Sequence, residues 1–248
     1  MRAGAAGVVV DWERRGKRRR QAGADTQINA DTPDHLAAVR AATNGRVVCR
    51  VNGWGPWTAA EIDLAVALGA DEILLPMVRR VEEVDAAVER VAGRCGLAIL
   101  IETCDAVRRA DDLLRRPLSR VYVGLNDLMI DRGSGPLFAA LVDGTADRLS
   151  TLAADAGIPF GLGGLTVPEG GHPVPSHLLA GELARLGTSF TFLRRSFHAD
   201  TAGRDLDVEI PRILAMVDEA RGRAADQVAV ERAQLEATVG LQFEQRAV

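Results

Sequence analysis

The sequence predicts an α/β protein, a (β/α)8 TIM barrel whose first strand is missing from this chain. Three observations support this prediction. The chain has 248 residues, and a single barrel of this type needs about 250. Short apolar runs alternate with helical stretches along the whole chain, which is typical of a parallel sheet covered by helices. Seven such βα units can be read, evenly spaced, and no glycine-rich nucleotide-type turn follows the first of them.

The elements follow one another in a regular order. The first predicted strand comes directly after Ala3–Ala6, where a preceding helix would end, so we expect the first barrel strand and most of its helix to be absent from this chain. The predicted strands are short and apolar, because both faces of a parallel sheet are buried. They are Gly7–Asp11, Arg46–Asn52, Asp71–Pro76, Gly96–Glu102, Ser119–Leu125, Pro159–Gly164 and Ser189–Arg194.

The predicted helices separate these strands and continue beyond the last of them. They are Asp34–Thr43, Thr58–Leu68, Val81–Val91, Asp105–Arg115, a longer helical region that reaches Ala156, His177–Leu186, Val208–Arg221 and Ala224–Ala237. No linker, repeat or charge block divides the chain. We therefore expect one catalytic barrel domain over residues 1–248, with a C-terminal helical extension over residues 224–248.

The composition excludes several classes of protein. Hydrophobic residues make up 47% of the chain and charged residues 26%, the usual globular mixture. No apolar run approaches the ~20 residues needed to cross a bilayer, and a net charge of −4 gives no basic field for nucleic acid. The three cysteines form neither a disulfide framework nor a CxxC metal site. We expect a cytoplasmic protein whose partners are small molecules, not nucleic acid or a membrane.

Lysine is almost absent from the chain. Of the 30 basic residues only Lys17 is a lysine. It lies in the basic stretch Arg14–Arg20, which we expect to be a solvated loop that can attract an anionic substrate. An enzyme that forms an imine with its substrate needs a lysine whose amine is neutral near pH 7, usually through burial. We therefore do not expect lysine-imine chemistry.

Two acidic residues follow neighbouring predicted strands, at the end of the barrel where active sites lie. Glu102 ends the apolar run Leu97–Ile101, and Asp127 follows the next strand. Adjacent strands are ~4.8 Å apart, so the two carboxylates can converge on Mg²⁺ or Mn²⁺, with water and substrate completing the shell. Alternatively, each acid caps the following helix. Asn126, directly before Asp127, is a candidate for substrate binding.

Arginine and glycine occupy other strand ends. Arg50 shares a strand face with Val48 and Asn52, because side chains alternate along a strand. Its guanidinium can bind a carboxylate in bidentate fashion, or form an Arg–Asp pair that closes the barrel end. Gly163 and Gly164 let the backbone approach a ligand closely, and they also fit an ordinary tight turn.

Proton-transfer candidates are less clearly marked. The histidines form no HxH or HxxxH pair, so a zinc site is not expected. His198, just after Arg194–Phe197, is one candidate proton donor or acceptor, and Glu13 after the first strand is another. The loop that carries Trp54 and Trp57 can wall a pocket, although packing is the commoner role of such aromatic residues.

The strand ends form an ordered set. Its segments are Val8–Glu13 (VVVDWE), Cys49–Gly53 (CRVNG), Ile73–Met77 (ILLPM), Leu100–Thr103 (LIET) and Gly124–Leu128 (GLNDL). This set resembles the HpcH/HpaI aldolase/citrate lyase β-subunit family, of the phosphoenolpyruvate/pyruvate barrel type, and the resemblance extends to about Leu214. Members of that family make or break carbon–carbon bonds through a metal-bound enolate.

The resemblance implies roles for three residues. Glu102 and Asp127 would hold a divalent cation, Mg²⁺ or Mn²⁺, and Arg50 would stabilise the enolate oxygen or the carboxylate of the keto acid. It also implies a homo-oligomer, a trimer or hexamer, in which residues 224–248 pack on a neighbouring subunit. We expect the seven-stranded barrel either to be closed by another chain or to belong to a gene that starts upstream.

Departures from the family pattern leave the general base open. The aldolase branch has a histidine in the loop after its strand matching Val8–Asp11, where this chain has none. That branch also tends to have glutamine at Leu100, and the citrate lyase branch tends to have lysine at Met77. Glu13, a metal-held water and His198 remain the candidate bases.

We expect a class II-type, metal-dependent carbon–carbon lyase or aldolase that acts on pyruvate or a related 2-keto acid. One alternative is an acyl-CoA ester lyase or thioester hydrolase of the citrate lyase β type. Another, from a different class, is a catalytically reduced barrel used as a binding or assembly subunit. Proton exchange at pyruvate C3 with and without the divalent ion separates the catalytic from the non-catalytic alternatives.

Overall fold

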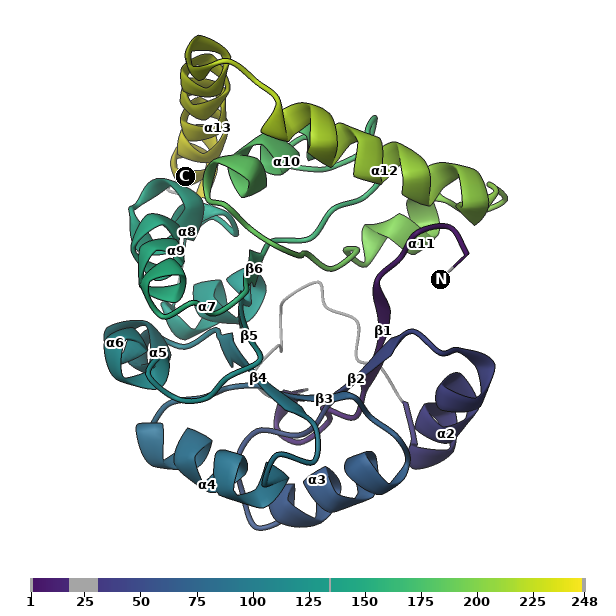
Figure 1. The fold of residues 1–248 in the computed structure, drawn as a ribbon. Helices are drawn as coiled ribbons and strands as arrows, with labels where there is room; N and C mark the ends of the chain where they lie inside the picture. Colours follow the sequence, from purple (N-terminus) through teal and green to yellow (C-terminus); the bar gives the residue numbers. More distant parts are fainter. Residues whose placement is uncertain (1, 18–30, 134, 247–248) are drawn as a thin grey trace.

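A single parallel sheet, curled around the middle of the molecule, organises the fold (Figure 1). The computed structural model describes residues 2–17, 31–133 and 135–246, with side chains through residue 242. Within these ranges six strands pair in chain order, each with the next. They are β1 (Gly7–Asp11), β2 (Arg46–Arg50), β3 (Glu72–Leu75), β4 (Gly96–Ile101), β5 (Arg120–Val123) and β6 (Phe160–Leu162). The alternation of apolar runs with helical stretches therefore predicted the parallel sheet correctly.

Helices cover the outer surface of this sheet (Figure 1). Those that follow the first five strands are α2 (Pro33–Ala42), α3 (Thr58–Ala67), α4 (Val81–Val91), α5 (Cys104–Arg108), α6 (Ala110–Leu113), α7 (Leu125–Asp131), α8 (Ala139–Val142) and α9 (Thr145–Asp155). The later ones are α10 (Ser176–Arg185), α11 (Ser196–Asp200), α12 (Leu206–Arg221) and α13 (Ala225–Arg246). The helices α10, α11 and α12 occupy the side between β6 and β1.

The structure does not confirm a closed eight-stranded barrel. The described residues give a partial barrel of six strands, and the predicted seventh strand, Ser189–Arg194, forms only two isolated parallel bridges, Gly161 with Phe190 and Leu165 with Leu193. The interruption has a local cause, because Gly163 has a φ of +78° and ends the extended backbone of β6. The ladder therefore breaks between the two bridges.

Apolar side chains pack on both faces of the sheet. The larger core lies between strands and helices and contains the fully buried Ile73, Ile99 and Ile101. A smaller inner core fills the space that the sheet encloses. Its members are Val48, Leu74, Ala98, Leu100 and Tyr122, with Phe190 and Phe192 packed against them. The inner core makes the enclosed space a packed interior, as in other barrels of this type.

The C-terminal helices pack on the outside of the partial barrel. Helix α13 contacts α10 and α8, and it buries Leu235 and Val239 almost completely. Arg232 ties it to the rest of the chain, because its Nη1 donates to the carbonyl of Leu141 and to Glu182 at 2.7 and 2.5 Å. None of the helices in the described ranges is both long and apolar enough to cross a membrane. The packing of residues 224–248 on a neighbouring subunit stays a prediction.

Candidate active site at the carboxyl ends of the strands

The register of the first two strands places Asp11 directly beside Arg50. The guanidinium of Arg50 binds the Asp11 carboxylate through two atoms, with Nε 2.8 Å from Oδ1 and Nη2 2.5 Å from Oδ2. Burial alone would raise the pKa of Asp11, but the Arg50 hydrogen bond and the charges of Arg50 and Lys17 lower it to about 2. The Arg–Asp pair that was one of two alternatives for Arg50 is thus present. None of its hydrogen bonds to described residues uses Nη1, and the side chain stays 23% exposed.

Lys17 lies in this cluster, which corrects the prediction that it is solvated. Lys17 is only 3% exposed. Its Nζ is 3.1 Å from Asp11 Oδ2 and 3.3 Å from Oε2 of Glu13. Glu13 is itself buried and lies 3.7 Å from Nε of Arg50. The side chain enters because tertiary contacts fix the loop, and no feature of a basic run reveals those contacts. Residues 18–20 of the predicted basic stretch lie outside the described residues.

The loop after β1 is fixed to the end of β2 by Asn52. The Asn52 Oδ1 atom accepts hydrogen bonds from the backbone N–H groups of Arg14 and Arg15, both at 2.8 Å. Glu61 in the first turn of α3 orients Asn52, because its carboxylate accepts from the Asn52 backbone N–H at 3.0 Å and from Nδ2 at 2.8 Å. This chain of contacts sets the path of the backbone that leads to Lys17.

Glu102 follows β4 and is 2% exposed. Its Oε1 atom accepts a hydrogen bond of 2.9 Å from the backbone N–H of Met77, a residue that has a left-handed φ of +56°. Burial, then the charges of Asp127 and Glu13, raise the pKa of Glu102 to about 8, against the charge of Arg50 and the Met77 hydrogen bond. Glu102 is therefore electrostatically linked to both carboxylates and to the guanidinium.

Asp127 and Asn126 lie in the first turn of α7, which corrects their placement at the end of a strand. Strand β5 ends at Val123, and Gly124 begins the turn into the helix because no side chain fits there. A Cβ atom at Gly124 would lie 2.4 Å from Oε2 of Glu102. Asp127 is buried, whereas Asn126 is half-buried. The junction thus brings α7 directly against the Glu102 side chain.

Neither carboxylate is the side chain that caps its neighbouring helix. The hydroxyl of Thr103 caps α5 by accepting from the N–H of Ala106 at 3.0 Å, and α7 begins at Gly124 without a side-chain cap. Among the described residues no group of three or more His, Cys, Asp and Glu side chains is arranged to hold a metal. Two carboxylates suit a cation such as Mg²⁺, which takes one or two from the protein and fills its shell with water and substrate oxygens.

The remaining candidate residues from the sequence are the two glycines after β6, Gly163 and Gly164, and His198 on α11. The carbonyl of Gly163 accepts a hydrogen bond from the Tyr122 hydroxyl, and a Cβ on Gly164 would contact Cβ of Arg194 at 3.1 Å. His198 is exposed on α11, where its ring contacts that of Phe197. No hydrogen bond or ion pair between described residues joins His198 to Arg50 or Glu102. Glu13 is thus the candidate base that lies within the cluster.

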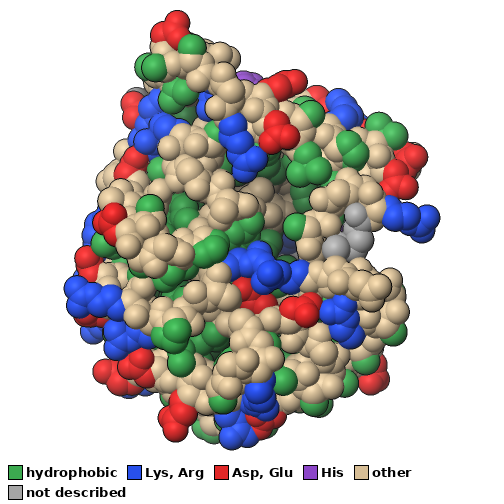
Figure 2. Space-filling model, viewed as in Figure 1, with side chains coloured by type: hydrophobic (Ala, Val, Ile, Leu, Met, Phe, Trp, Pro, Cys, Tyr) green, Lys and Arg blue, Asp and Glu red, His purple; other side chains and the backbone are tan. Residues whose placement is uncertain are grey.

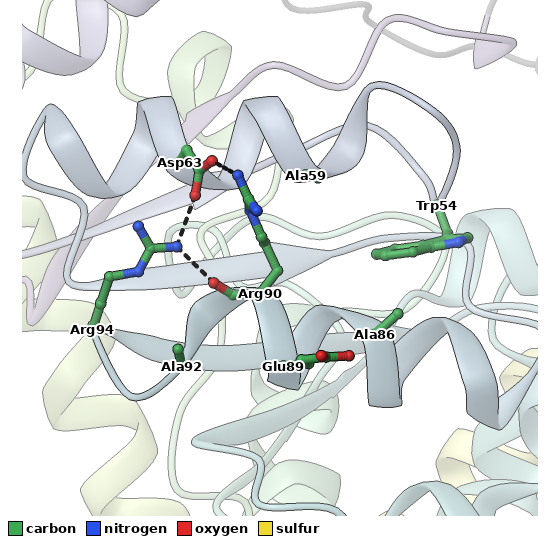
Figure 3. A pocket seen from close by; sticks show the side chains of 8 residues that line it. All are labelled: Trp54, Ala59, Asp63, Ala86, Glu89, Arg90, Ala92 and Arg94. Atoms are coloured by element: carbon green, nitrogen blue, oxygen red, sulfur yellow. Dashed lines mark hydrogen bonds and ion pairs between the residues drawn. The ribbon is translucent and has the colours of Figure 1, made fainter.

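The two tryptophans of the loop after β2 have different surroundings. Trp54 lines a groove of about 690 Å³ on the outer surface between α3 and α4, together with Asp63, Arg90 and Arg94 (Figure 3). The two arginines pair with Asp63 across this groove. Trp57 packs under the guanidinium of Arg15, 4.4 Å from its ring centre. The groove contains none of the strand-end residues, so it is separate from the candidate site.

Surface charges are mixed in sign. On the face shown in Figure 2, acidic and basic side chains are interspersed and form no continuous field of one sign. Ion pairs between segments distant in the chain include Arg116 with Asp85 and Arg148 with Asp111.

Sequence reasoning missed three residues of the site. Asp11 was read as a strand end without a role, Lys17 was assigned to a solvated loop, and Met77 was noted only as a departure from a family pattern. Lys17 did carry a signal, because it is the only lysine among 30 basic residues and lies in the loop that follows the first strand. The hydrogen bond from Met77 to Glu102 depends on a backbone conformation that the sequence does not specify.

Comparisons with known proteins agree with the fold. Residues 1–140 match the family model described as HpcH/HpaI aldolase/citrate lyase. Among solved structures, RipC from Yersinia pestis is similar with a TM-score of 0.61 and 15% identity, over 91% of this chain and 93% of that chain. An HpcH/HpaI aldolase from Desulfitobacterium hafniense DCB-2 gives 0.58 and 16%, over 90% and 86%.

A citrate lyase from Burkholderia xenovorans LB400 is also similar, with a TM-score of 0.58 and 12% identity, over 97% of this chain and 83% of that chain. At these identities the structural likeness establishes the fold alone. The comparison with curated proteins found no match.

Proposed function

Because the chain belongs to the HpcH/HpaI aldolase/citrate lyase family, whose members are lyases that act on carbon–carbon bonds, we propose that it is a divalent-metal-dependent lyase or aldolase for pyruvate or a related 2-keto acid. One observation carries this proposal. At the carboxyl edge of the sheet, Arg50 ends β2, the buried carboxylate Glu102 follows β4, and the buried Asp127 lies in the first turn of the helix after β5. The charges of Asp127 and Arg50 both act on Glu102. This combination offers ligands for a cation beside a positive group for an organic anion.

Glu102 and Asp127 would hold the cation, Mg²⁺ or Mn²⁺, with water and substrate oxygens. When bound, the cation would act as a Lewis acid that stabilises negative charge on the substrate. The raised pKa of Glu102 supports this assignment, since a buried carboxylate beside two others gains from a nearby positive charge.

Arg50 supplies the positive charge that faces the substrate. Asp11 fixes the plane of the guanidinium through Nε and Nη2, so that Nη1 is the donor we assign to the keto-acid carboxylate or enolate oxygen. Glu13 is the proton acceptor that we assign to the substrate hydroxyl, because it is the candidate base inside the cluster. His198 is not assigned a step.

Proton exchange at pyruvate C3 in D₂O tests this function. We expect the loss of the methyl proton signal to require Mg²⁺ or Mn²⁺. Glu102→Gln and Asp127→Asn should abolish exchange and Mn²⁺ binding measured by calorimetry. Arg50→Lys keeps the charge but loses the planar fork, and should lower exchange by roughly tenfold or more, about 1.4 kcal/mol in activation free energy.

Asp85→Asn is the matched control, because Asp85 pairs with Arg116 on the outer surface. This variant should leave exchange unchanged. Unaltered Mn²⁺ affinity in both carboxylate variants would refute the metal assignment. Exchange that persists in EDTA would refute metal dependence. A chain that binds the cation but exchanges no pyruvate protons, while processing an acyl-CoA thioester, would favour the citrate lyase type of activity.

A further inference from the structure

Lys17 is the only lysine of the chain, and the fold places it in the candidate active site. The three residues before it, Arg14, Arg15 and Gly16, are exposed, whereas Lys17 is 3% exposed. Gly16 has a φ of +72°, in the left-handed region that glycine adopts readily. The chain turns back at this glycine, so the ammonium group returns to the end of β1.

Contacts on both sides of the loop hold this arrangement. The side chain of Asn52 accepts hydrogen bonds from two successive backbone N–H groups of the loop, and the guanidinium of Arg15 packs on the ring of Trp57. The Lys17 N–H also donates to the Arg14 carbonyl at 3.4 Å. The loop therefore presents Lys17 to Asp11 and Glu13 in a defined geometry.

The charge arrangement suggests why an ammonium group is at this position. Asp11 and Glu13 are both buried, and both contact Arg50 as well as Lys17. Lys17 thus places a second positive charge beside the two carboxylates, in addition to that of Arg50. Buried ion pairs seldom improve stability over apolar packing, so stability alone does not account for this lysine.

We propose that Lys17 is a positioning residue of the active site, which binds Asp11 and Glu13 and thereby leaves Arg50 available for the carboxylate of the 2-keto acid. This proposal rests on the proposed lyase function. Removal of Lys17 takes one positive charge away from Asp11 and Glu13, and this change favours a bound cation and disfavours an anionic substrate.

The test compares the binding of pyruvate with the binding of Mn²⁺, because the loss of Lys17 should affect the two in opposite directions. In the full chain, Lys17→Met should weaken pyruvate binding in the presence of Mg²⁺ by tenfold or more, measured by calorimetry, while Mn²⁺ alone should bind at least as tightly as in the wild type. Lys17→Arg should recover pyruvate affinity to within about threefold. Arg116→Met is the control, because it removes a positive charge from an ion pair with Asp85 on the outer surface, away from Asp11 and Glu13.

Labelling with [¹⁵Nζ]lysine adds a readout that does not depend on turnover, because the chain contains a single ε-ammonium group. We expect one ammonium signal, protected from solvent exchange, that shifts when pyruvate and Mg²⁺ are added. An unprotected signal that pyruvate leaves unchanged would overturn the proposal.

Three further outcomes separate this proposal from the proposed function. Wild-type pyruvate affinity in Lys17→Met, with normal exchange by the wild-type chain, overturns the role of Lys17 alone. Parallel loss of Mn²⁺ and pyruvate binding in both Lys17 variants shows a purely structural role and also overturns it. A wild-type chain that neither binds pyruvate nor exchanges its protons overturns the proposed function, and the role of Lys17 in it.

Discussion

Glu102 is a buried carboxylate that faces two other carboxylates, and its protonation links the site to the stability of the fold. The folded state holds the Glu102 proton to a pH of about 8, whereas an ordinary glutamate has a pKa of 4.5. Between these pH values the folded state binds more protons than the unfolded state. The free energy of unfolding therefore falls as the pH rises through this window.

We predict that Glu102→Gln stabilises the metal-free protein at high pH. Glutamine keeps the shape and the acceptor for the Met77 N–H but removes the charge. In EDTA at pH 9, urea unfolding should give the variant a free energy of unfolding on the order of 1–3 kcal/mol above wild type. The difference should vanish near pH 4.5. A difference that is the same at both pH values would show that the charge is not its cause.

At the scale of single residues, the sequence predicted which side chains lie at the carboxyl edge better than it predicted which of them are buried. Glu102 and Arg50 occupy the predicted strand ends, and the structure links them electrostatically. Lys17 was misplaced because its burial depends on Asn52 and Glu61, which lie more than thirty residues further along the chain. A run of arginines indicates solvent exposure on average, and only the tertiary contacts show which member of the run turns inward.

The junction between β5 and α7 sets the position of the Glu102 side chain. Gly124 lies between these elements, and its hydrogen atom occupies the space where a Cβ would lie 2.4 Å from Oε2 and 2.9 Å from Cβ of Glu102. Such contacts are closer than van der Waals packing allows, so the Glu102 carboxylate or the start of α7 would have to move.

We predict that Gly124→Ala abolishes Mn²⁺ binding and lowers the free energy of unfolding by about 1–3 kcal/mol, the usual cost of overpacking. Calorimetry and urea unfolding measure the two effects. Gly240→Ala in α13 is the matched control, because no heavy atom of the described part of the chain lies within 4 Å of a Cβ built there, and alanine favours a helix. Unchanged Mn²⁺ affinity in Gly124→Ala would show that this junction does not shape the site.

At the scale of elements, the sequence predicted which helices and strands exist more accurately than it predicted where each of them ends. The helix predicted over residues 105–115 is divided at Arg109 into α5 and α6. The strand predicted through Leu125 ends at Val123, so Asp127 lies on a helix. Apolar runs mark where the chain is buried, but they do not show where a ladder of backbone hydrogen bonds stops. The break at Gly163 is such a case.

The C-terminal helix α13 joins the partial barrel through a narrow apolar stripe. Leu235 is 1% exposed in its contact with the rest of the chain, whereas Leu241 on the same helix is 58% exposed. Both residues are leucines on the same helix. Replacing each of them by alanine therefore separates the contribution of packing from that of helix propensity.

We predict that Leu235→Ala lowers the free energy of unfolding by about 2–4 kcal/mol, the usual cost of an apolar cavity. Leu241→Ala should change it by less than about 0.5 kcal/mol. Urea unfolding measured by circular dichroism provides the comparison. Equal effects of the two substitutions would indicate that α13 does not pack on this chain as described. The expected trimer or hexamer is a separate prediction, which sedimentation measures.

For the whole molecule, the sequence predicted the parallel architecture but not its closure. The alternation of strands and helices leads to a curled sheet, and the local pattern of Ser189–Arg194 resembles that of the true strands. Closure is a property of the assembled sheet, because it depends on the register of each pair and on the backbone at Gly163. A count of apolar runs cannot report these quantities.

The inner core fills the space enclosed by the sheet beneath the candidate site. Tyr122 and Leu100 lie inside the curled sheet at 5% and 2% exposure, and Phe192 stacks on Tyr122 with ring centres 4.3 Å apart. Among the described residues, this core fills the inside of the sheet, so we expect a ligand of the proposed site to approach Arg50 and Glu102 from the carboxyl edge. If the proposed lyase takes its two reactants from the same edge, a bulky acceptor bound first would block the keto acid. We therefore predict that steady-state kinetics follow an ordered sequence in which the keto acid binds first.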